Sequence, residues 1–325
     1  MKYSSAGHRA LEYAAVPAFH DNYIWVISNG RDAVVIDPGD EAPVRTYLRA
    51  RRVRLSAILL THHHGDHTGG VLALAGEQDI PVYGPASEKI PGVTHPVREK
   101  SAVRIKTLGL IFSVLEVPGH TLGHIAFLLP GSPSEPSRLF CGDTLFACGC
   151  GRLFEGTPRQ MLASLDKLAA LPESTRVYCA HEYTLANIRF ARACEPENAE
   201  LHHWQHQAEM RRAEGVPTVP TTIGHERRVN PFFRLNAPGI LRYVNSPARA
   251  FFSEIAQGVE REDSMNRDRC GRSGSPSYSD GGDPAASPNT ASASDVVQAA
   301  EKCASRRNDR LAVFTALRAC KDNFA

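Results

Sequence analysis

The chain has 325 residues, 42% of them hydrophobic and 22% charged, with a formal net charge of +2 at pH 7. This length and hydrophobic content allow two domains with a buried core, and the small net charge excludes a bulk electrostatic affinity for nucleic acid or membrane surfaces. A membrane-spanning helix needs about 18 or more consecutive apolar residues, and neither such a run nor an apolar signal core at the N-terminus occurs, so a cytoplasmic protein without nucleic-acid or membrane partners is expected.

Residues 1–182 contain short hydrophobic runs typical of β-strands, separated by turns and helical patterns. The dipeptide Asn29-Gly30 predicts a hairpin between strands at 23–28 and 33–37. Further strands are expected at 57–60, 81–84, 103–107, 110–117, 125–129, 138–141 and 176–180. Helices are expected at 42–52, 69–77 and 158–170, and a loop at 85–99. Strands that alternate with helices in two successive halves predict two sheets face to face with helices outside.

A cluster of metal-ligand residue types follows the strand expected at 57–60: His62-His63-His64-Gly65-Asp66-His67. In an extended segment His62 and His64 point to the same side, so both can reach one cation. A turn at Gly65 would direct Asp66 and His67 towards a second position. Imidazole and carboxylate donors suit zinc, iron or manganese. The alternative is a surface histidine cluster, or histidines that are satisfied within a core.

Three further polar residues follow hydrophobic runs in the same way: His120, Asp143 and His181. The order H-x-H-x-D-H, then His, Asp and His, resembles the metallo-β-lactamase superfamily. The motifs G-D-T-L-F at 142–146 and H-E-Y-T at 181–184 resemble those of the hydroxyacylglutathione hydrolase family, also called glyoxalase II. The resemblance covers residues 10–240 and 309–324, and it implies an α+β fold. An αββα metallo-β-lactamase sandwich at 1–182 would precede a small helical substrate-binding domain at 183–325.

The resemblance also implies a binuclear centre with two divalent cations, zinc first, with iron or manganese as alternatives. One cation would be held by His62, His64 and His120, the other by Asp66, His67 and His181, with Asp143 bridging. Such a pair lowers the pKa of a shared water from about 15.7 towards about 7, so a metal-bridged hydroxide is the expected nucleophile. Asp66 would orient this nucleophile. The implied reaction is hydrolysis of S-(2-hydroxyacyl)glutathione thioesters such as S-D-lactoylglutathione, the second step of methylglyoxal detoxification.

Five residues outside the metal ligands are expected to contact the glutathione thioester. Arg152 lies in a loop that resembles the family's glutathione-contacting loop, and Tyr183 matches a tyrosine beside the thiol. Phe154 stands where some relatives have tyrosine, so one hydrogen bond to substrate is in question. Arg318 and Lys321, in the final R-x-x-K-D-x-F wording, would meet the tripeptide carboxylates. The alternative for this pair is an interaction with a helix C-terminus.

Residues beyond 182 are expected to be mostly helical, at 183–193, 196–214 and 309–322. A Ser/Gly/Pro-rich segment at about 264–294 has almost no large apolar residue, so it is expected to be a disordered insert that relatives lack. His202, His203 and His206 share a helix, where a solvated face is expected rather than a metal site. His124 is expected in a supporting role, and the protein is expected to be a monomer.

Other functions remain open on the sequence alone. A lactonase or another binuclear hydrolase, a mononuclear iron persulfide dioxygenase and a non-catalytic scaffold share the superfamily's ligand order. The eight cysteines contain no C-x-x-C pair, so they are expected to be reduced and to pack as small hydrophobic residues. For Cys148-Gly149-Cys150 a metal or redox pair is the alternative. The sequence leaves the metal, the preferred acyl group and the effect of the insert undetermined.

Overall fold

The computed structural model describes residues 10–76, 80–246 and 309–324, which fall into two compact units, Met1–Arg234 and Leu235–Ala325. The first unit holds both sheets, and the second contains helix α8, Pro238–Val244, and a helix at 309–322. The expected insert at 264–294 lies outside the described residues. The compact units divide the chain later than the expected boundary after residue 182, which stays a prediction.

The first sheet has six strands in the order β1-β2-β3-β4-β5-β6. They are β1 Glu12–Ala18, β2 Asn22–Ser28, β3 Asp32–Ile36, β4 Arg54–Leu59, β5 Val82–Pro85 and β6 His95–Val97. The pairs β1–β2 and β2–β3 are antiparallel, whereas β3 to β6 run parallel. The Asn29-Gly30 hairpin is confirmed, with Gly30 at φ 78°.

The second sheet has the order β14-β13-β10-β9-β8-β7. Its strands are β7 Ala102–Ile105, β8 Leu110–Glu116, β9 Ile125–Leu129, β10 Arg138–Gly142, β13 Arg176–Cys179 and β14 Thr221–Thr222. Strands β7 to β10 are antiparallel neighbours, β10 and β13 are parallel, and β13 and β14 are antiparallel. A small hairpin, β11 Leu145–Phe146 and β12 Gly149–Cys150, stands apart.

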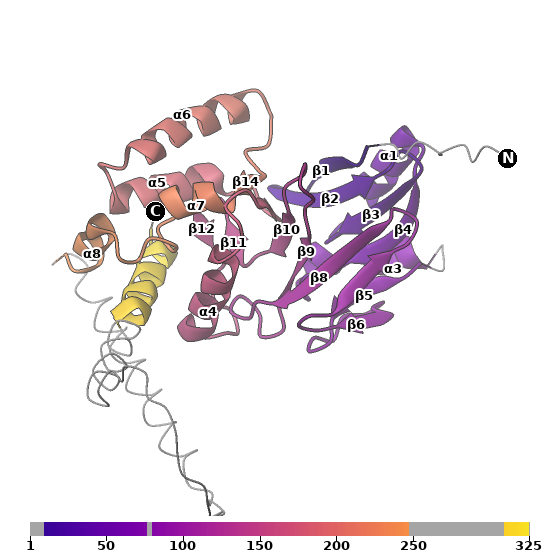
Figure 1. The fold of residues 1–325 in the computed structure, drawn as a ribbon, viewed down its shortest axis with the longest axis horizontal. Coiled ribbons are helices and arrows are strands. Elements are labelled where there is room, and N and C mark those ends of the chain that lie inside the picture. Colours follow the sequence, from indigo (N-terminus) through magenta and orange to yellow (C-terminus); the bar gives the residue numbers. More distant parts are fainter. Residues whose placement is uncertain (1–9, 77–79, 247–308, 325) are drawn as a thin grey trace, which may run out of the picture. The chain divides into compact units, whose positions relative to one another are not determined.

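The two sheets pack face to face with helices outside (Figure 1). Between the sheets, Trp25 of β2 meets the ring of Tyr178 edge-on at 4.8 Å and donates from Nε1 to the Cys179 carbonyl at 2.8 Å. Outside the first sheet, Val44 of α1 (Glu41–Arg51) and Val71 of α3 (Val71–Ala75) join its buried core. The predicted α+β sandwich is confirmed.

On the second sheet's side lie four helices of the first unit: α4 Pro158–Ala169, α5 Thr184–Cys194, α6 Ala199–Ala213 and α7 Ile223–Val229 (Figure 1). Helix α4 begins with a capping box between Thr157 and Gln160 and has Pro158 in its first turn. Its predicted apolar side is buried through Met161, Leu162, Leu165 and Leu168. No helix of the described residues is long and apolar enough to cross a membrane.

Two sequence-based predictions of local structure are wrong, and two strands, β1 and β14, were not predicted. In place of one helix at 69–77, the structure has two short helices, α2 Gly65–Thr68 and α3, separated at Gly69-Gly70. The chain that follows β3 packs closely against this break. A Cβ at Gly70 would lie 2.6 Å from the Glu41 nitrogen. The loop expected at 85–99 contains edge strand β6. Strand β14 extends the second sheet beyond residue 182, where a mostly helical structure was expected.

Candidate metal centre and active site

Four strand ends bring the candidate ligands to one edge of the sandwich. Strand β4 leads into His62 to His67, and β8, β10 and β13 lead into His120, Asp143 and His181. In the second sheet β10 and β13 are parallel, and β8 is separated from β10 by one antiparallel strand, so all three end at the same edge. The delivery of these side chains to one place follows from this topology.

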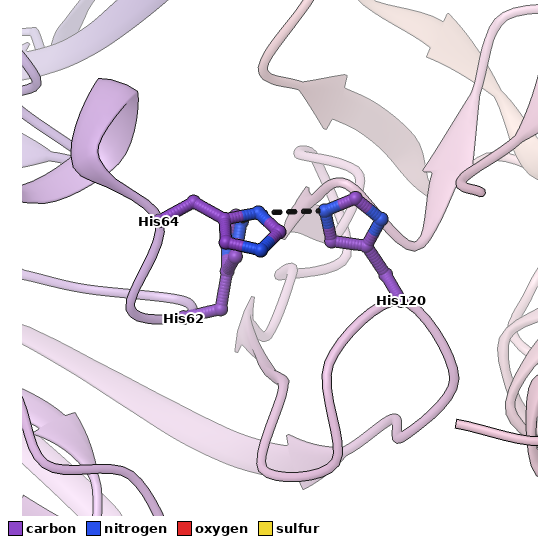
Figure 2. A group of neighbouring side chains, drawn as sticks. All are labelled: His62, His64 and His120. Atoms are coloured by element: carbon purple, nitrogen blue, oxygen red, sulfur yellow. Dashed lines mark hydrogen bonds between the residues drawn. The ribbon is translucent and has the colours of Figure 1, made fainter. Parts of the chain in front are cut away.

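Three histidines form the first donor group: His62, His64 and His120. His64 Nδ1 lies 3.1 Å from His62 Nε2 and 3.0 Å from His120 Nε2. Figure 2 shows the His62 and His64 rings, from one loop, turned towards the His120 ring from another. The backbone at His64 is extended, with φ −60° and ψ 145°, so His62 and His64 share a side as predicted.

Asp143 lies between this group and a second one. Its Oδ2 is 3.4 Å from His120 Nε2 and 3.3 Å from His181 Nε2, and its Oδ1 is 3.5 Å from His67 Nε2. Gly142 before it has φ 48°, and a Cβ there would lie 2.3 Å from Thr61 Oγ1, so only glycine fits this close contact. Asp143 thus reaches both donor groups, with Oδ2 beside His120 and His181 and Oδ1 beside His67.

The second donor group consists of Asp66, His67 and His181. Asp66 Oδ2 is 3.4 Å from His67 Nε2 and 3.5 Å from His181 Nε2. Asn22 Nδ2 donates to the same Asp66 oxygen at 3.0 Å. A third group, His62, His67 and Asp143, overlaps the other two, so all seven predicted ligands lie in one connected cluster.

The donor set fits divalent cations. His67 Nε2 and Asp143 Oδ1 are buried 3.5 Å apart without a well-formed hydrogen bond, which is costly unless another group satisfies them. In the first group three imidazole nitrogens converge, and neutral imidazoles each have one lone pair to offer. A cation bound between these buried nitrogen and oxygen atoms would satisfy them. The cluster is therefore a divalent-metal site by its chemistry.

Burial and neighbouring charges favour the ligand protonation states. Burial lowers the pKa of His62 well below its ordinary value, so the ring is neutral. Burial opposes ionisation of Asp143 as well, but His67 and His181 outweigh it and hold the carboxyl pKa well below normal. At His67 burial is outweighed by Asp143 and two further carboxylates, and the pKa is raised well above normal. A cation would take the place of that proton.

Outer partners orient the ligand rings, and the sequence reasoning missed them. His181 Nδ1 lies 2.7 Å from Asp21 Oδ1, and His67 Nδ1 lies 3.2 Å from Asp37 Oδ2. His120 Nδ1 lies 2.9 Å from the Arg152 carbonyl oxygen, to which it donates in the matching tautomer. Such partners set the tautomer and ring orientation of ligating histidines. The one available signal was that Asp37 directly follows a strand.

Three of the five expected substrate residues border the cluster. The exposed ring of Phe154 lies edge-on to His64 and His120, at 5.5 and 5.2 Å between centroids. The Tyr183 ring stacks on His181 at 4.7 Å with an interplanar angle of 4°. Arg152 has an exposed side chain, and its charge bears on the pKa of Tyr183. Aromatic rings therefore cover both donor groups.

The other two expected substrate residues lie in the second compact unit. Arg318 is 4% exposed, and its guanidinium pairs with Asp322 at 2.8 Å. The Lys321 ammonium lies over the Phe324 ring at 5.9 Å. Their role in substrate binding stays a prediction.

The remaining histidines and cysteines have structural surroundings. His124 is buried, stacks on the His62 ring at 4.5 Å and accepts from the Asp143 amide at 3.2 Å, as its supporting role requires. His95, His202, His203 and His206 are exposed. None of these four belongs to a metal-competent group within the described residues. Cys148 and Cys150 are buried and form no disulfide there.

Two protein-family models match this chain. The metallo-β-lactamase superfamily model matches residues 18–181, and the model of the hydroxyacylglutathione hydrolase C-terminus matches residues 182–261. Among solved structures, the crystal structure of ETHE1 from Myxococcus xanthus aligns with a TM-score of 0.50 at 27% identity, covering 70% of this chain and 92% of that one. A metallo-β-lactamase structure from Staphylococcus aureus, at 21% identity and a TM-score of 0.52, supports the fold alone.

Curated relatives are closer in sequence. A hydroxyacylglutathione hydrolase of Alkalilimnicola ehrlichii is 58% identical over 231 residues, which covers 70% of this chain and 88% of the relative. One of Cupriavidus taiwanensis is 54% identical over 243 residues, which covers 73% of this chain and 91% of the relative. The alignments thus span most of each relative.

Proposed function

Because this chain belongs to the hydroxyacylglutathione hydrolase family of the metallo-β-lactamase superfamily, we propose that it hydrolyses S-(2-hydroxyacyl)glutathione thioesters, with S-D-lactoylglutathione as the first candidate substrate. The products would be glutathione and a 2-hydroxy acid. The observation that carries this proposal is the connected cluster of seven imidazole and carboxylate donors, with aromatic rings at both sides.

Two divalent cations, zinc first, would complete this cluster. His62, His64 and His120 would hold one, Asp66, His67 and His181 the other, and Asp143 would contact both, since its carboxylate lies near His120 on one side and near His67 and His181 on the other. When bound, the pair would supply a water of lowered pKa and polarise the thioester carbonyl. Iron and manganese accept the same donors.

The chain's own residues position the reactants. Asn22 holds Asp66 Oδ2, so the partly exposed Asp66 carboxylate is fixed as an acceptor that orients the attacking water. A thiolate leaves readily, so no side chain has to protonate it. A cysteine nucleophile is not needed, and burial raises the pKa of the Cys141 and Cys148 thiols well above normal.

The substrate residues would act outside the metal ligands. Tyr183 and Phe154 offer exposed aromatic surface beside the two donor groups, and Arg152 adds a positive charge on the same loop as Phe154. Glutathione carries two carboxylates, which arginine and lysine recognise. Arg318 and Lys321 are proposed as further contacts to them. A monomeric state and a cytoplasmic location stay predictions.

The test compares substrates and metals in one preparation. Purified protein should contain about two metal ions per chain and should turn over S-D-lactoylglutathione faster than a panel of lactones, without consuming oxygen when given glutathione persulfide. The variant His120→Ala should lose metal and activity together. His202→Ala, which removes an exposed histidine of α6, is the matched control. Turnover of lactones or persulfide in place of the thioester would replace the proposed function, and normal metal content without any turnover would indicate a scaffold.

A further inference from the structure

The β11–β12 hairpin is linked to both sides of the proposed active site. On one side, the Phe146 ring contacts the Tyr183 ring at 5.2 Å and the His181 ring at 5.8 Å. On the other side, the chain leaves the hairpin through Gly151 and reaches Arg152, whose carbonyl oxygen lies 2.9 Å from His120 Nδ1. A shift of this hairpin would therefore move the surroundings of both donor groups.

Side chains from elsewhere bond the backbone at the hairpin's tip. Asn230 Nδ2 lies within donor distance of the Gly149 carbonyl at 3.0 Å and the Phe146 carbonyl at 3.3 Å. Glu226 Oε2 accepts from the Cys148 amide at 2.9 Å. Asn187 Nδ2 of α5 donates to the Ala147 carbonyl at 3.0 Å. Four successive residues thus have a backbone group satisfied by a side chain more than 35 positions away.

Glu226 and Asn230 form one unit, the hairpin clamp. Asn230 Nδ2 also donates to Glu226 Oε2 at 2.9 Å, and both side chains are 0% exposed. The clamp holds the tip in a conformation that L-residues rarely adopt, since Cys148 has φ 56°. Such a backbone persists only where its surroundings over-determine it. The clamp is therefore specific to this backbone rather than general packing.

The clamp needs an acceptor at Glu226 rather than a charge. Burial raises the pKa of Glu226 to about 7, so the carboxyl is partly neutral at physiological pH. The bonds from the Cys148 amide and from Asn230 Nδ2 both go to one oxygen, Oε2, and a glutamine at this position would offer one oxygen in the same place. Removal of the acceptor would leave a buried amide N–H of Cys148 unpaired.

We propose that Glu226 and Asn230 are positioning residues that fix the β11–β12 hairpin and, through it, the two sides of the active site. Their hydrogen bonds to the hairpin go to Phe146, Cys148 and Gly149, which are neither metal-ligand candidates nor proposed substrate residues. The kinetic part of this proposal rests on the proposed thioester hydrolysis. The structural part concerns the hairpin alone.

The experiment compares Glu226→Ala and Glu226→Gln with Glu195→Ala as control. Glu195 is also buried, but its carboxylate binds Arg234 and not the hairpin. Backbone hydrogen exchange of the segment 145–150 is measured in metal-loaded protein, together with kcat and KM for the thioester. For Glu226→Ala we expect hydrogen exchange in that segment to be about tenfold faster or more, because the tip opens more often without the bonds that Glu226 accepts. We also expect kcat/KM to fall about tenfold or more, since misplacement by about 1 Å costs on the order of 100-fold.

Glu226→Gln should stay within about threefold of the wild type in both measurements, since hydrogen-bond acceptance is retained. Glu195→Ala should lose stability without either change. If Glu226→Ala does not fold, Asn230→Asp provides the same test, because it keeps the volume and removes the bonds that Nδ2 donates. Hairpin exchange in Glu226→Ala equal to that in Glu195→Ala, or faster exchange with unchanged kcat/KM, would overturn the proposal. A wild type that leaves the thioester intact would refute the proposed function, while the exchange data would still decide whether the clamp exists.

Discussion

Replacement of Asp21 by alanine tests whether outer partners hold the metal centre. Asp21 Oδ1 lies 2.7 Å from His181 Nδ1, on the ring edge opposite the nitrogen that faces Asp66 and Asp143. This contact fixes the ring's orientation and tautomer and raises the basicity of Nε2. Asp21→Ala should therefore weaken binding of one cation, the one held by the second donor group.

The size of the effect follows from the geometry of this contact. A hydrogen bond to a charged group contributes about 1.5–3 kcal/mol. The Asp21 side chain is 33% exposed, so solvent screening places the value near the lower end. Because about 1.4 kcal/mol corresponds to a tenfold change, the affinity for the second cation should fall about tenfold. Asp21→Asn keeps an acceptor without the charge, so about a threefold loss is expected.

Chelator competition measures the two dissociation steps separately. Asp21→Ala should shift one of the two steps and leave the other unchanged, and kcat/KM should fall in parallel at limiting zinc. Asp40→Ala is the matched control, because Asp40 accepts from the Ala42 amide at the start of α1 and faces no ligand. Equal metal affinity in Asp21→Ala and wild type would refute the argument that this carboxylate supports His181.

Four other measurements test the fold and the site. Phe112→Ala should cost about 3–5 kcal/mol in urea unfolding, since Phe112 is fully buried, and Thr157→Ala about 1 kcal/mol, since it removes the α4 cap. Chelator removal of metal should abolish thioester hydrolysis, and added zinc should restore it. The folded pKa of Glu226 is raised to about 7, so its share of the stability is present below about pH 4.5 and is lost as pH rises through about 7. Relative to Glu226→Gln, the wild type should lose about 3 kcal/mol between these pH values, and a constant difference would contradict the buried carboxyl.

The candidate ligands were predictable because each one directly follows a buried strand. Hydrophobic runs identify β4, β8, β10 and β13 from the sequence, and the polar residues that follow these runs mark the strand ends that meet at one edge. The His and Asp residues after these strands then indicate the chemistry at that edge. The ligand cluster therefore depends on short stretches of sequence, which pattern reasoning interprets well.

The outer partners were not predictable because they depend on contacts between distant parts of the chain. Asn22 forms an isolated antiparallel bridge with His181, and this bridge places Asp21 beside the His181 ring. Nothing near residue 21 indicates a contact 160 positions away. The break between α2 and α3 was not predicted for a related reason. It depends on the packing of Gly39 and Gly70 against neighbouring backbone. In both cases tertiary contacts override local pattern.

The same contacts explain why the sandwich and the metal centre must form together. His67 follows a strand of the first sheet and His181 a strand of the second, yet Asp66 and Asp143 lie within 3.5 Å of both rings. The sheets are joined nearby by the Tyr23 amide, which donates to the Ala180 carbonyl, and by the Trp25 indole. A change in the distance between the sheets would separate the donors of one cation. Cation binding should therefore stabilise the packing of one sheet on the other, since a ligand that binds only the folded state shifts the folding equilibrium towards it.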